Sequence, residues 1–293
     1  MKNYLSINSP IPSFNKVLNV PGDKSLSIRW VLLASQAIGK SKAYNLLESD
    51  DVISTIVSMR KLGVEILKKD GYYEINGVGL SGFRHKNNLH LNAGNSGTFA
   101  RLLCGTLAGN IKNVKVTGDS SLSKRDFSRV VKPLELFGIN IKTKKNKLPI
   151  TITGSKYLRP IFYKEDKGSA QVKSAILLAS LNTPGQTIVK SKISRNHTEL
   201  MFKNCLKIPL KLKKYKNYET IKVEGKTNYK GFNYKIPGDI SSAAFFIALT
   251  ALANKSSLKM KNVNYNKSRT GIIEILKKMR AKIKITNIKN YKG

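Results

Sequence analysis

A nine-residue stretch, Pro21 to Arg29, combines the residue types that bind anions. After a tight turn it places Lys24, Ser25 and Arg29 just ahead of and within an apolar segment that is typical of a helix. Backbone N–H groups at the start of a helix attract negative charge. Lysine adds a flexible point charge, and arginine adds a planar fork that fits phosphate or carboxylate. The stretch predicts an anion-binding loop; an ordinary capped helix with surface charges is the alternative.

The same pattern returns three times along the chain. Small or hydroxyl-bearing turns begin at Asn92, Lys167 and Pro237, and each runs into a segment of apolar and small residues. A segment with an amphipathic helix pattern follows each of them. In three of the four cases the second segment ends 40 to 43 positions after the turn, and self-similarity at this spacing indicates repeated structural units.

Each repeat predicts one buried helix, one amphipathic helix and intervening strands. The apolar runs that predict buried helices are Trp30–Ala34, Leu102–Ala108, Ser174–Ala179 and Ala243–Leu249. The segments that predict strands are 114–116, 141–142, 188–190 and 283–285. An α-solenoid is the alternative for a repeat of this length, but the strand segments argue against it. The pattern therefore favours a layered α/β fold.

Six segments, in order along nearly the whole chain, resemble the 5-enolpyruvylshikimate-3-phosphate (EPSP) synthase family. One such segment is weak evidence, whereas six in the family's order are specific. The segments are Pro21 to Arg29; Asn95-Ser96-Gly97-Thr98 with Arg101; Thr117-Gly118-Asp119 with Lys124-Arg125; Ser169 to Lys173; Ser194 to Glu199; and Pro237 to Phe245.

The resemblance implies an α/β fold of repeated βαβαββ units arranged in two domains. Residues 20–236 would form one complete domain of three units. Residues 1–19 with 237–293 would form about one unit of the second domain, so the chain is expected to be truncated at its C-terminus relative to the family. An incomplete domain exposes an apolar face, and self-association or binding of a partner chain is expected there. A complete short enzyme, a half-enzyme that needs a second chain, and an inactive relic all remain open.

The activity implied by the resemblance is enolpyruvyl transfer from phosphoenolpyruvate to the 5-hydroxyl of shikimate 3-phosphate, with release of phosphate. This is a step of chorismate and aromatic amino acid biosynthesis. Both substrates are polyanions, so positioned cations stabilise the reacting charges. No metal or organic cofactor is expected.

The resemblance also assigns roles to individual residues. Lys24 would contact both substrates and help to move a proton, and Gly97 would let phosphoenolpyruvate approach the backbone. The residues expected to bind shikimate 3-phosphate are Lys24, Ser25, Arg29, Ser169, Gln171, Ser194 and Arg195. The residues expected to bind phosphoenolpyruvate are Lys24, Gly97, Arg125 and Gln171.

The use of arginine supports an anion site independently of the resemblance. The chain has 53 lysines and arginines, of which 10 are arginine. Five of these lie in the repeated segments: Arg29, Arg101, Arg125, Arg195 and Arg269. A chain that otherwise uses lysine places arginine where a bidentate fork is useful. The alternative is that loops ahead of helices are simply polar.

Two other functions are weighed against this one. An enolpyruvyl transferase acting on UDP-N-acetylglucosamine shares the fold but relies on a loop cysteine, and Cys104 lies in an apolar helix pattern. The net charge of +36 is typical of a nucleic-acid-binding protein. The lysines are spread along the chain, however, so no specific nucleic-acid site is expected.

The remaining composition excludes other classes of protein. No apolar run of about 18 residues predicts a membrane span, and the N-terminus lacks a signal-peptide core, so a cytoplasmic protein is expected. Cys104 and Cys205 are predicted to be free thiols. The three histidines have no metal-ligand spacing, and a structural role is expected for His197.

Overall fold

The computed structural model describes residues 11–291, which divide into two compact units. The larger unit contains Lys24–Ile236 with residues 290–291, and the smaller contains residues 11–23 with Pro237–Lys289. No helix among residues 11–291 is long and apolar enough to cross a membrane.

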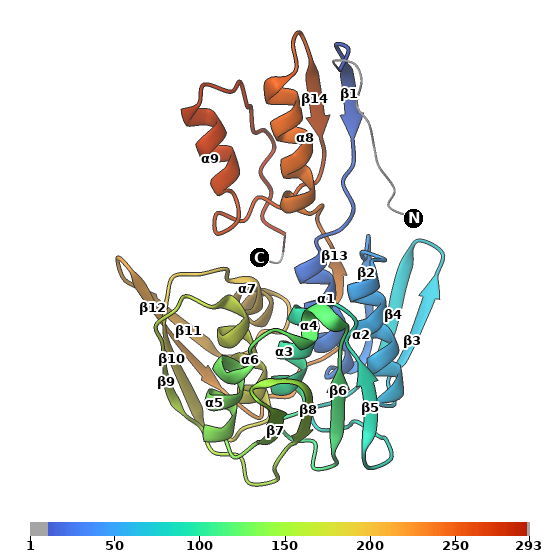
Figure 1. Cartoon of the computed structure of the whole chain (residues 1–293), viewed down its shortest axis with the longest axis vertical. Helices are drawn as coiled ribbons and strands as arrows, with labels where there is room; N and C mark the ends of the chain where they lie inside the picture. Colours follow the sequence, from blue (N-terminus) through green and yellow to red (C-terminus); the bar gives the residue numbers. More distant parts are fainter. Residues whose placement is uncertain (1–10, 292–293) are drawn as a thin grey trace. The chain divides into compact units, whose positions relative to one another are not determined.

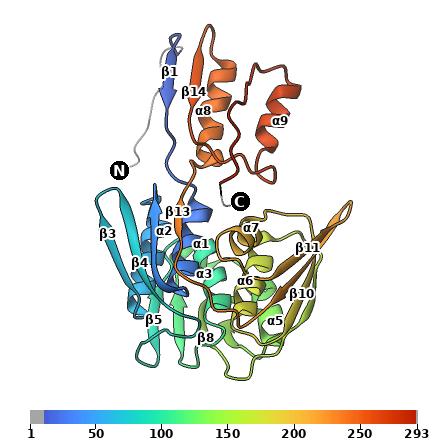
Figure 2. The ribbon, with the colours of Figure 1, turned by 180° about the vertical axis from the view of Figure 1, so that it is seen from behind.

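The larger unit is built from three repeats, each with a four-stranded sheet, a buried helix and at least one outer helix (Figures 1 and 2). The first contains α1 (Lys24–Ser35), β2 (Ile38–Tyr44), α2 (Asp50–Lys61), β3 (Glu65–Lys69), β4 (Tyr72–Val78) and β13 (Asn233–Lys235). The second contains β5 (Leu89–Asn92), α3 (Gly97–Thr106), β6 (Val114–Thr117), α4 (Ser120–Ser123), α5 (Ser128–Leu136), β7 (Asn140–Lys144) and β8 (Lys147–Thr153). The third contains β9 (Phe162–Glu165), α6 (Ala170–Leu181), β10 (Gln186–Lys192), α7 (His197–Asn204), β11 (Leu210–Lys214) and β12 (Tyr218–Glu224).

The three sheets share one topology. The strand orders are β13-β2-β4-β3, β5-β6-β8-β7 and β9-β10-β12-β11. In each sheet the first two strands are parallel and the other neighbours are antiparallel. The first repeat takes its parallel strand, β13, from the far end of the unit. The repeats seen in the sequence are therefore βαβαββ units in space, although one of them is not continuous in the chain.

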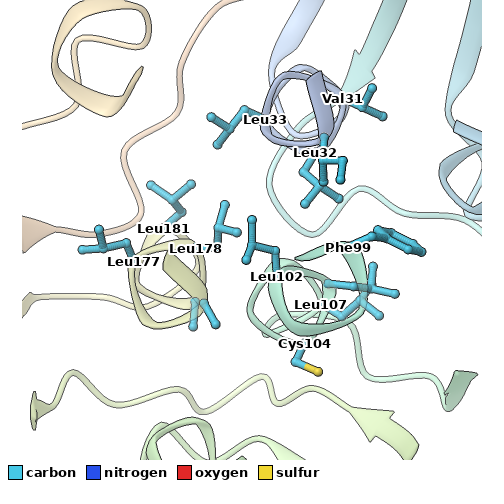
Figure 3. Packing of buried hydrophobic residues seen from close by; sticks show 14 of the residues in the cluster. Val31, Leu32, Leu33, Phe99, Leu102, Cys104, Leu107, Leu177, Leu178 and Leu181 are labelled. Atoms are coloured by element: carbon cyan, nitrogen blue, oxygen red, sulfur yellow. The ribbon is translucent and has the colours of Figure 1, made fainter. Parts of the chain in front are cut away.

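The helices α1, α3 and α6 form the centre of the larger unit. All three begin at a predicted loop and are buried on nearly every side. Figure 3 shows Leu32, Leu102 and Leu178 from the three helices facing one another, and each is at most 1% exposed. Close packing of these buried side chains fixes the starts of the three helices relative to one another. The predicted buried helices in these three repeats are confirmed.

Three glycines occupy equivalent places in the repeats and explain how closely sheet and helix approach. Gly77, Gly154 and Gly225 lie at or just beyond the ends of β4, β8 and β12. A Cβ at any of these positions would overlap backbone carbonyl oxygens at the end of the buried helix of the same repeat. Only glycine allows this approach of strand to helix.

The smaller unit contains the parallel pair β1 (Asn15–Leu18) and β14 (Ser257–Met260) with α8 (Ile240–Leu252) and α9 (Gly271–Lys278). Its core consists of Val20, Ile240, Ala243 and Ile273. The strand predicted at 283–285 is wrong, because no strand lies there. Ile283 and Ile285 pack against the core, but no neighbouring strand in the described part of the unit pairs with their backbone.

The predicted burial of the run 243–249 is also wrong for most of α8. Only Ile240 and Ala243 of this helix are buried, whereas Phe245 is 79% exposed and Leu252 is 88% exposed. Within the described part of the smaller unit, two strands and one further helix are too few to cover an apolar helix on all sides.

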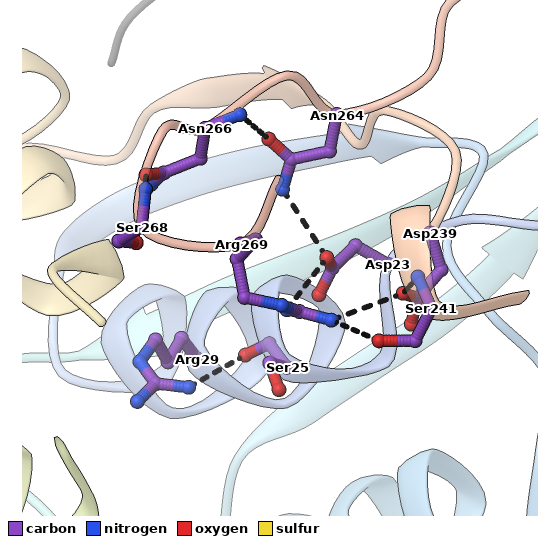
Figure 4. Close-up of polar contacts among 9 residues, drawn as sticks. All are labelled: Asp23, Ser25, Arg29, Asp239, Ser241, Asn264, Asn266, Ser268 and Arg269. Carbon is purple, nitrogen blue, oxygen red and sulfur yellow. Dashed lines mark hydrogen bonds and ion pairs between the residues drawn. The ribbon is translucent and has the colours of Figure 1, made fainter. Parts of the chain in front are cut away.

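The two segments that connect the units run side by side within the smaller unit. The Asp23 backbone N–H donates to the Pro237 carbonyl at 2.8 Å, and the Asp239 N–H donates to the Pro21 carbonyl at 2.9 Å. Figure 4 shows the Arg269 guanidinium between the two aspartates, with Nη1 3.2 Å from Asp23 Oδ2 and Nη2 3.2 Å from Asp239 Oδ1. Arg269 therefore joins the two connecting segments, and this contact explains its place in a repeated motif.

Candidate active site

Four of the predicted shikimate 3-phosphate residues line one small pocket in the larger unit. They are Ser25, Arg29, Gln171 and Arg195, and the lining is completed by Thr98, Ala170 and His197. We call this the anion pocket. These residues come from α1, α3 and α6 and from the start of α7, so all three repeats contribute to it. The buried helices bring their starts together, and the loops that precede them meet at one place.

Arg29 is the best-anchored cation in the anion pocket. Arg29 as a whole residue is only 5% exposed. Nε donates to Thr198 Oγ1 at 2.8 Å, Nη2 to Ser174 Oγ at 2.9 Å, and Nη1 to the Ser25 carbonyl at 3.0 Å. Figure 4 shows the last of these contacts. These bonds from three helices hold the guanidinium plane in a fixed orientation, as recognition of a phosphate requires.

Gln171 connects the anion pocket to a second group of cations. Its Oε1 accepts from Arg101 Nη1 at 3.1 Å, and its Nε2 donates to Thr98 Oγ1 at 3.0 Å. Arg101 can only donate a hydrogen bond, whereas the Thr98 hydroxyl can accept one, so the two partners fix which way the Gln171 amide points. Gln171 therefore presents a set orientation to a ligand.

Gly97 lies between two arginines that we call the guanidinium pair, Arg101 and Arg125. A Cβ on Gly97 would meet Nη1 of both at 2.9 Å. Burial lowers the pKa of Arg101, and repulsion from Arg125 and Arg129 lowers it further. Like charges held this close attract an anion, and the absence of a side chain at Gly97 leaves room for one.

The Arg125 side chain is held by polar contacts in the second repeat. Its Nη2 donates to Asn95 Oδ1 at 3.0 Å, and Asn95 Nδ2 donates to Asp119 Oδ2 at 2.6 Å. Asp119 also caps α4, because its Oδ1 accepts from the Leu122 N–H at 2.7 Å. These hydrogen bonds lower the pKa of Asp119, so the carboxylate stays ionised.

Lys24 does not line the anion pocket. Its Nζ lies 2.8 Å from Asp51 Oδ2 on α2, and 47% of its side chain is exposed. Asp51 was not predicted as a site residue, because an acidic side chain in the first turn of a helix is an ordinary feature and carries no functional signal in a sequence.

Two predicted serines, Ser169 and Ser194, do not line the anion pocket. Ser169 caps α6, where its Oγ accepts from the Val172 N–H at 3.4 Å. The Ser194 hydroxyl oxygen is buried and makes no hydrogen bond with any described residue. A buried hydroxyl without a protein partner is suited to a ligand or a water molecule.

The model of the family described as EPSP synthase (3-phosphoshikimate 1-carboxyvinyltransferase) matches residues 9–292. The chain belongs to the EPSP synthase family. It is 41% identical over 276 residues to the 3-phosphoshikimate 1-carboxyvinyltransferase of Streptococcus mutans serotype c, which covers 92% of this chain and 62% of that protein. It is 42% identical over 274 residues to the enzyme of the same name from Thermoanaerobacter sp. strain X514, covering 92% of this chain and 63% of that protein. The chain thus spans less than two thirds of the length of these relatives.

Solved structures of the family have the same fold. An EPSP synthase from Acinetobacter baumannii superposes with a TM-score of 0.83 at 39% identity, covering 94% of this chain and 61% of that one. A second structure of EPSP synthase from this organism gives a TM-score of 0.82 at 38% identity. The predicted α/β fold of repeated βαβαββ units is therefore confirmed.

The structure adds residues to those predicted for this member of the EPSP synthase family. Thr98 and His197 line the anion pocket, and Arg101 holds Gln171. Arg101 was counted among the arginines that support an anion site, but no role was predicted for it. His197 was expected to be structural because an isolated histidine carries little signal in a sequence.

Cys104 takes no part in the candidate site. Burial raises the pKa of the Cys104 thiol to about 12, and the thiol donates to the Ala100 carbonyl within α3. A thiol in this position is unreactive. Among residues 11–291, no cluster of three or more histidine, cysteine, aspartate or glutamate side chains is arranged to hold a metal ion.

Proposed function

We propose that this chain binds shikimate 3-phosphate and phosphoenolpyruvate and takes part in transfer of the enolpyruvyl group to the 5-hydroxyl, with release of phosphate. The observation that carries the proposal is the meeting of Ser25, Arg29, Gln171 and Arg195 in one pocket. These residues lie as much as 170 positions apart in the chain. The names of the family members with about 40% identity support the same substrates.

The anion pocket suits shikimate 3-phosphate. Arg29 offers a guanidinium held by three hydrogen bonds, and Arg195 is exposed at the pocket with no side-chain partner among residues 11–291. A phosphate can accept hydrogen bonds from both arginines. Ser25 and Gln171 provide neutral polar groups for the hydroxyls of the ring.

The guanidinium pair suits phosphoenolpyruvate, which carries a carboxylate and a phosphate. Its position beside Gln171, which also lines the anion pocket, would bring the two substrates next to each other. Such proximity lowers the entropic barrier to joining them. The cations also stabilise the negative charge that is redistributed when phosphate leaves.

In the proposed reaction C3 of phosphoenolpyruvate gains a proton and the 5-oxygen loses its proton while bonding to C2. The tetrahedral adduct then loses phosphate and a proton from C3, which restores the enol double bond. Lys24 is proposed as the charge shared by both substrates and as a participant in proton movement. Its half-exposed side chain and its contact with Asp51 are compatible with this role.

The proposal includes three further expectations, which concern the domain division, the cellular location and the self-association of the chain. The first is the division into a three-unit domain at 20–236 and a second domain from 1–19 and 237–293, although the compact units described above place residues 20–23 with the smaller one. A cytoplasmic location is the second. Self-association at the exposed apolar side chains of α8 is the third, and equilibrium sedimentation of the chain at micromolar concentration measures it.

An Arg195→Ala variant tests the anion pocket with little risk to the fold. Arg195 is exposed and makes no ion pair with a described residue, so its removal should leave thermal unfolding unchanged. Loss of one charge-assisted hydrogen bond should weaken binding of shikimate 3-phosphate by about 1.5–3 kcal/mol. Titration calorimetry of the 293-residue chain measures the change.

The matched control is Arg84→Ala. Arg84 is also an exposed arginine of the larger unit, but it lines a different surface pocket. Its removal lowers the net charge equally and should not alter affinity. If both variants weaken shikimate 3-phosphate binding equally, the loss comes from the lower net charge of the protein, and Arg195 is not part of the site.

A Lys24→Met variant tests the shared-charge role. The half-exposed pair with Asp51 contributes about 0–1 kcal/mol, so the variant should unfold close to the wild-type temperature. Affinity for each substrate should fall about tenfold, because each loses one charged contact. Separate titrations with shikimate 3-phosphate and phosphoenolpyruvate distinguish the two losses, and unchanged affinity for both would contradict the assignment.

A further inference from the structure

Three ionisable side chains are buried together next to the anion pocket. Lys173 is fully buried, and its Nζ lies 2.6 Å from Glu199 Oε1 and 2.5 Å from Glu219 Oε1. The two glutamate side chains are 3% and 1% exposed. Removing three such groups from water is costly, and apolar side chains in their place are often neutral or stabilising. The cluster therefore calls for a role other than stability alone.

The cluster joins the starts of two helices that carry pocket residues. Lys173 is the fourth residue of α6, which begins with the pocket residues Ala170 and Gln171. Glu199 is the third residue of α7, which begins with the pocket residue His197. The ion pair therefore links the first turn of α6 to the first turn of α7.

A second, polar link lies directly beside the ion pair. Thr198 Oγ1 donates to Ser174 Oγ at 2.8 Å, and the same two hydroxyls accept from Nε and Nη2 of Arg29. Successive residues on α6 and α7 thus make successive interhelical contacts. The orientation of Arg29 depends on the same register that the ion pair fixes.

The two glutamates differ in how close they lie in the chain to residues of the anion pocket. Glu199 is separated from His197 by one residue and from Arg195 by three, whereas Glu219 lies on β12, which supplies no residue to the anion pocket. Burial raises the pKa of the Glu199 carboxyl, and Lys173 opposes this shift. Lys173 therefore favours the charged form of Glu199, in which the link between the helices is strongest.

We infer that Lys173 and Glu199 are positioning residues for the anion pocket. Their ion pair sets the start of α7 so that Arg195 and His197 lie in one pocket with Arg29 and Gln171, without either residue touching the ligand. The inference rests on the proposed function in taking shikimate 3-phosphate as that ligand.

The test compares Glu199→Gln with Glu219→Gln in the 293-residue chain. Both variants remove one negative charge from Lys173 with little change in shape, so both should lower the unfolding temperature to a similar extent. Glu199→Gln should weaken shikimate 3-phosphate binding about tenfold, and Glu219→Gln by less than about twofold. Equal weakening by the two variants, or wild-type affinity in a folded Glu199→Gln, would overturn the inference.

A second variant covers loss of folding. Glu199→Asp keeps the charge and shortens the side chain by one methylene group, which draws the start of α7 out of place. If Glu199→Gln does not fold, the same loss of about tenfold is expected for Glu199→Asp. A folded Glu199→Asp that binds like the wild type would overturn the inference.

Amide hydrogen exchange of the unliganded chain separates this inference from the proposed function. Glu199→Gln should speed exchange over residues 196–200 at least about tenfold more than Glu219→Gln does. If the wild-type chain does not bind shikimate 3-phosphate, the proposed function fails, and exchange decides the positioning role by itself. Equal exchange over these residues in both variants would contradict it.

Discussion

An Arg29→Met variant should lose about 3–5 kcal/mol of binding free energy for shikimate 3-phosphate, which is the largest loss expected from a single change at the site. Arg29 is nearly buried and is held by Ser25, Ser174 and Thr198. A cation held in place before the ligand arrives loses little freedom on binding, and methionine fills similar space without the charge. Titration calorimetry measures the loss.

The variant should also unfold more easily, because the hydroxyls and the carbonyl that accepted from Arg29 lose a partner. A cost of about 1–3 kcal/mol is expected for such groups. Arg29→Lys is the matched control, because it keeps the charge but cannot make three hydrogen bonds in a plane, and its affinity should be intermediate. A folded Arg29→Met that binds as tightly as the wild type would remove Arg29 from the site.

A Lys173→Met variant should lose about 3–5 kcal/mol of folding stability at pH 7. It leaves Glu199 and Glu219 buried without the cation that lies between them. Two uncompensated carboxylates repel each other and are cut off from water. Urea denaturation followed by circular dichroism measures the loss.

The pH dependence of this loss follows from the charges. Burial raises the pKa of Glu199, and without Lys173 its attraction no longer opposes this shift, so the folded variant takes up a proton at Glu199 as the pH falls. The difference in stability from the wild type should therefore shrink between pH 7 and pH 5. An equally large difference at both values would contradict the electrostatic account.

The matched control for this variant is Lys164→Met. Lys164 pairs with Asp166 at 3.3 Å, and both side chains are about 60% exposed. A surface pair of this kind contributes about 0–1 kcal/mol, so its removal should leave the urea midpoint nearly unchanged. A loss in Lys164→Met as large as in Lys173→Met would show that burial is not the cause.

The sequence predicted the elements whose signal is local. Trp30–Ala34, Leu102–Ala108 and Ser174–Ala179 are apolar on every side, and a helix of that composition is stable only in a core. Turn residues ahead of each run placed the start of each helix, and the strands at 114–116, 141–142 and 188–190 are present. The segment at 283–285 shows the limit, because a strand also needs a partner whose presence its own residues do not encode.

Only part of the candidate site was predicted, because some of its residues have a signal in the local sequence and others do not. Arginine stands out in a lysine-rich chain, and the resemblance to the family named Arg29, Arg125 and Arg195 as candidates. Thr98 and His197 were missed because a threonine or a histidine becomes part of a pocket only through what lies opposite it. The buried ion cluster was missed as well, since Lys173 resembles any other lysine until α6, α7 and β12 are packed together.

The sequence by itself determined the repeat, the helix starts and the kinds of charge available for anions, because these depend on neighbours along the chain. Only the tertiary structure decided that β13 completes the first repeat, that Arg269 joins the two connecting segments, and that Lys173 is buried between two glutamates. Those contacts join residues tens to hundreds of positions apart. Their geometry is set by the packing of whole helices and sheets, and local residue patterns do not specify it.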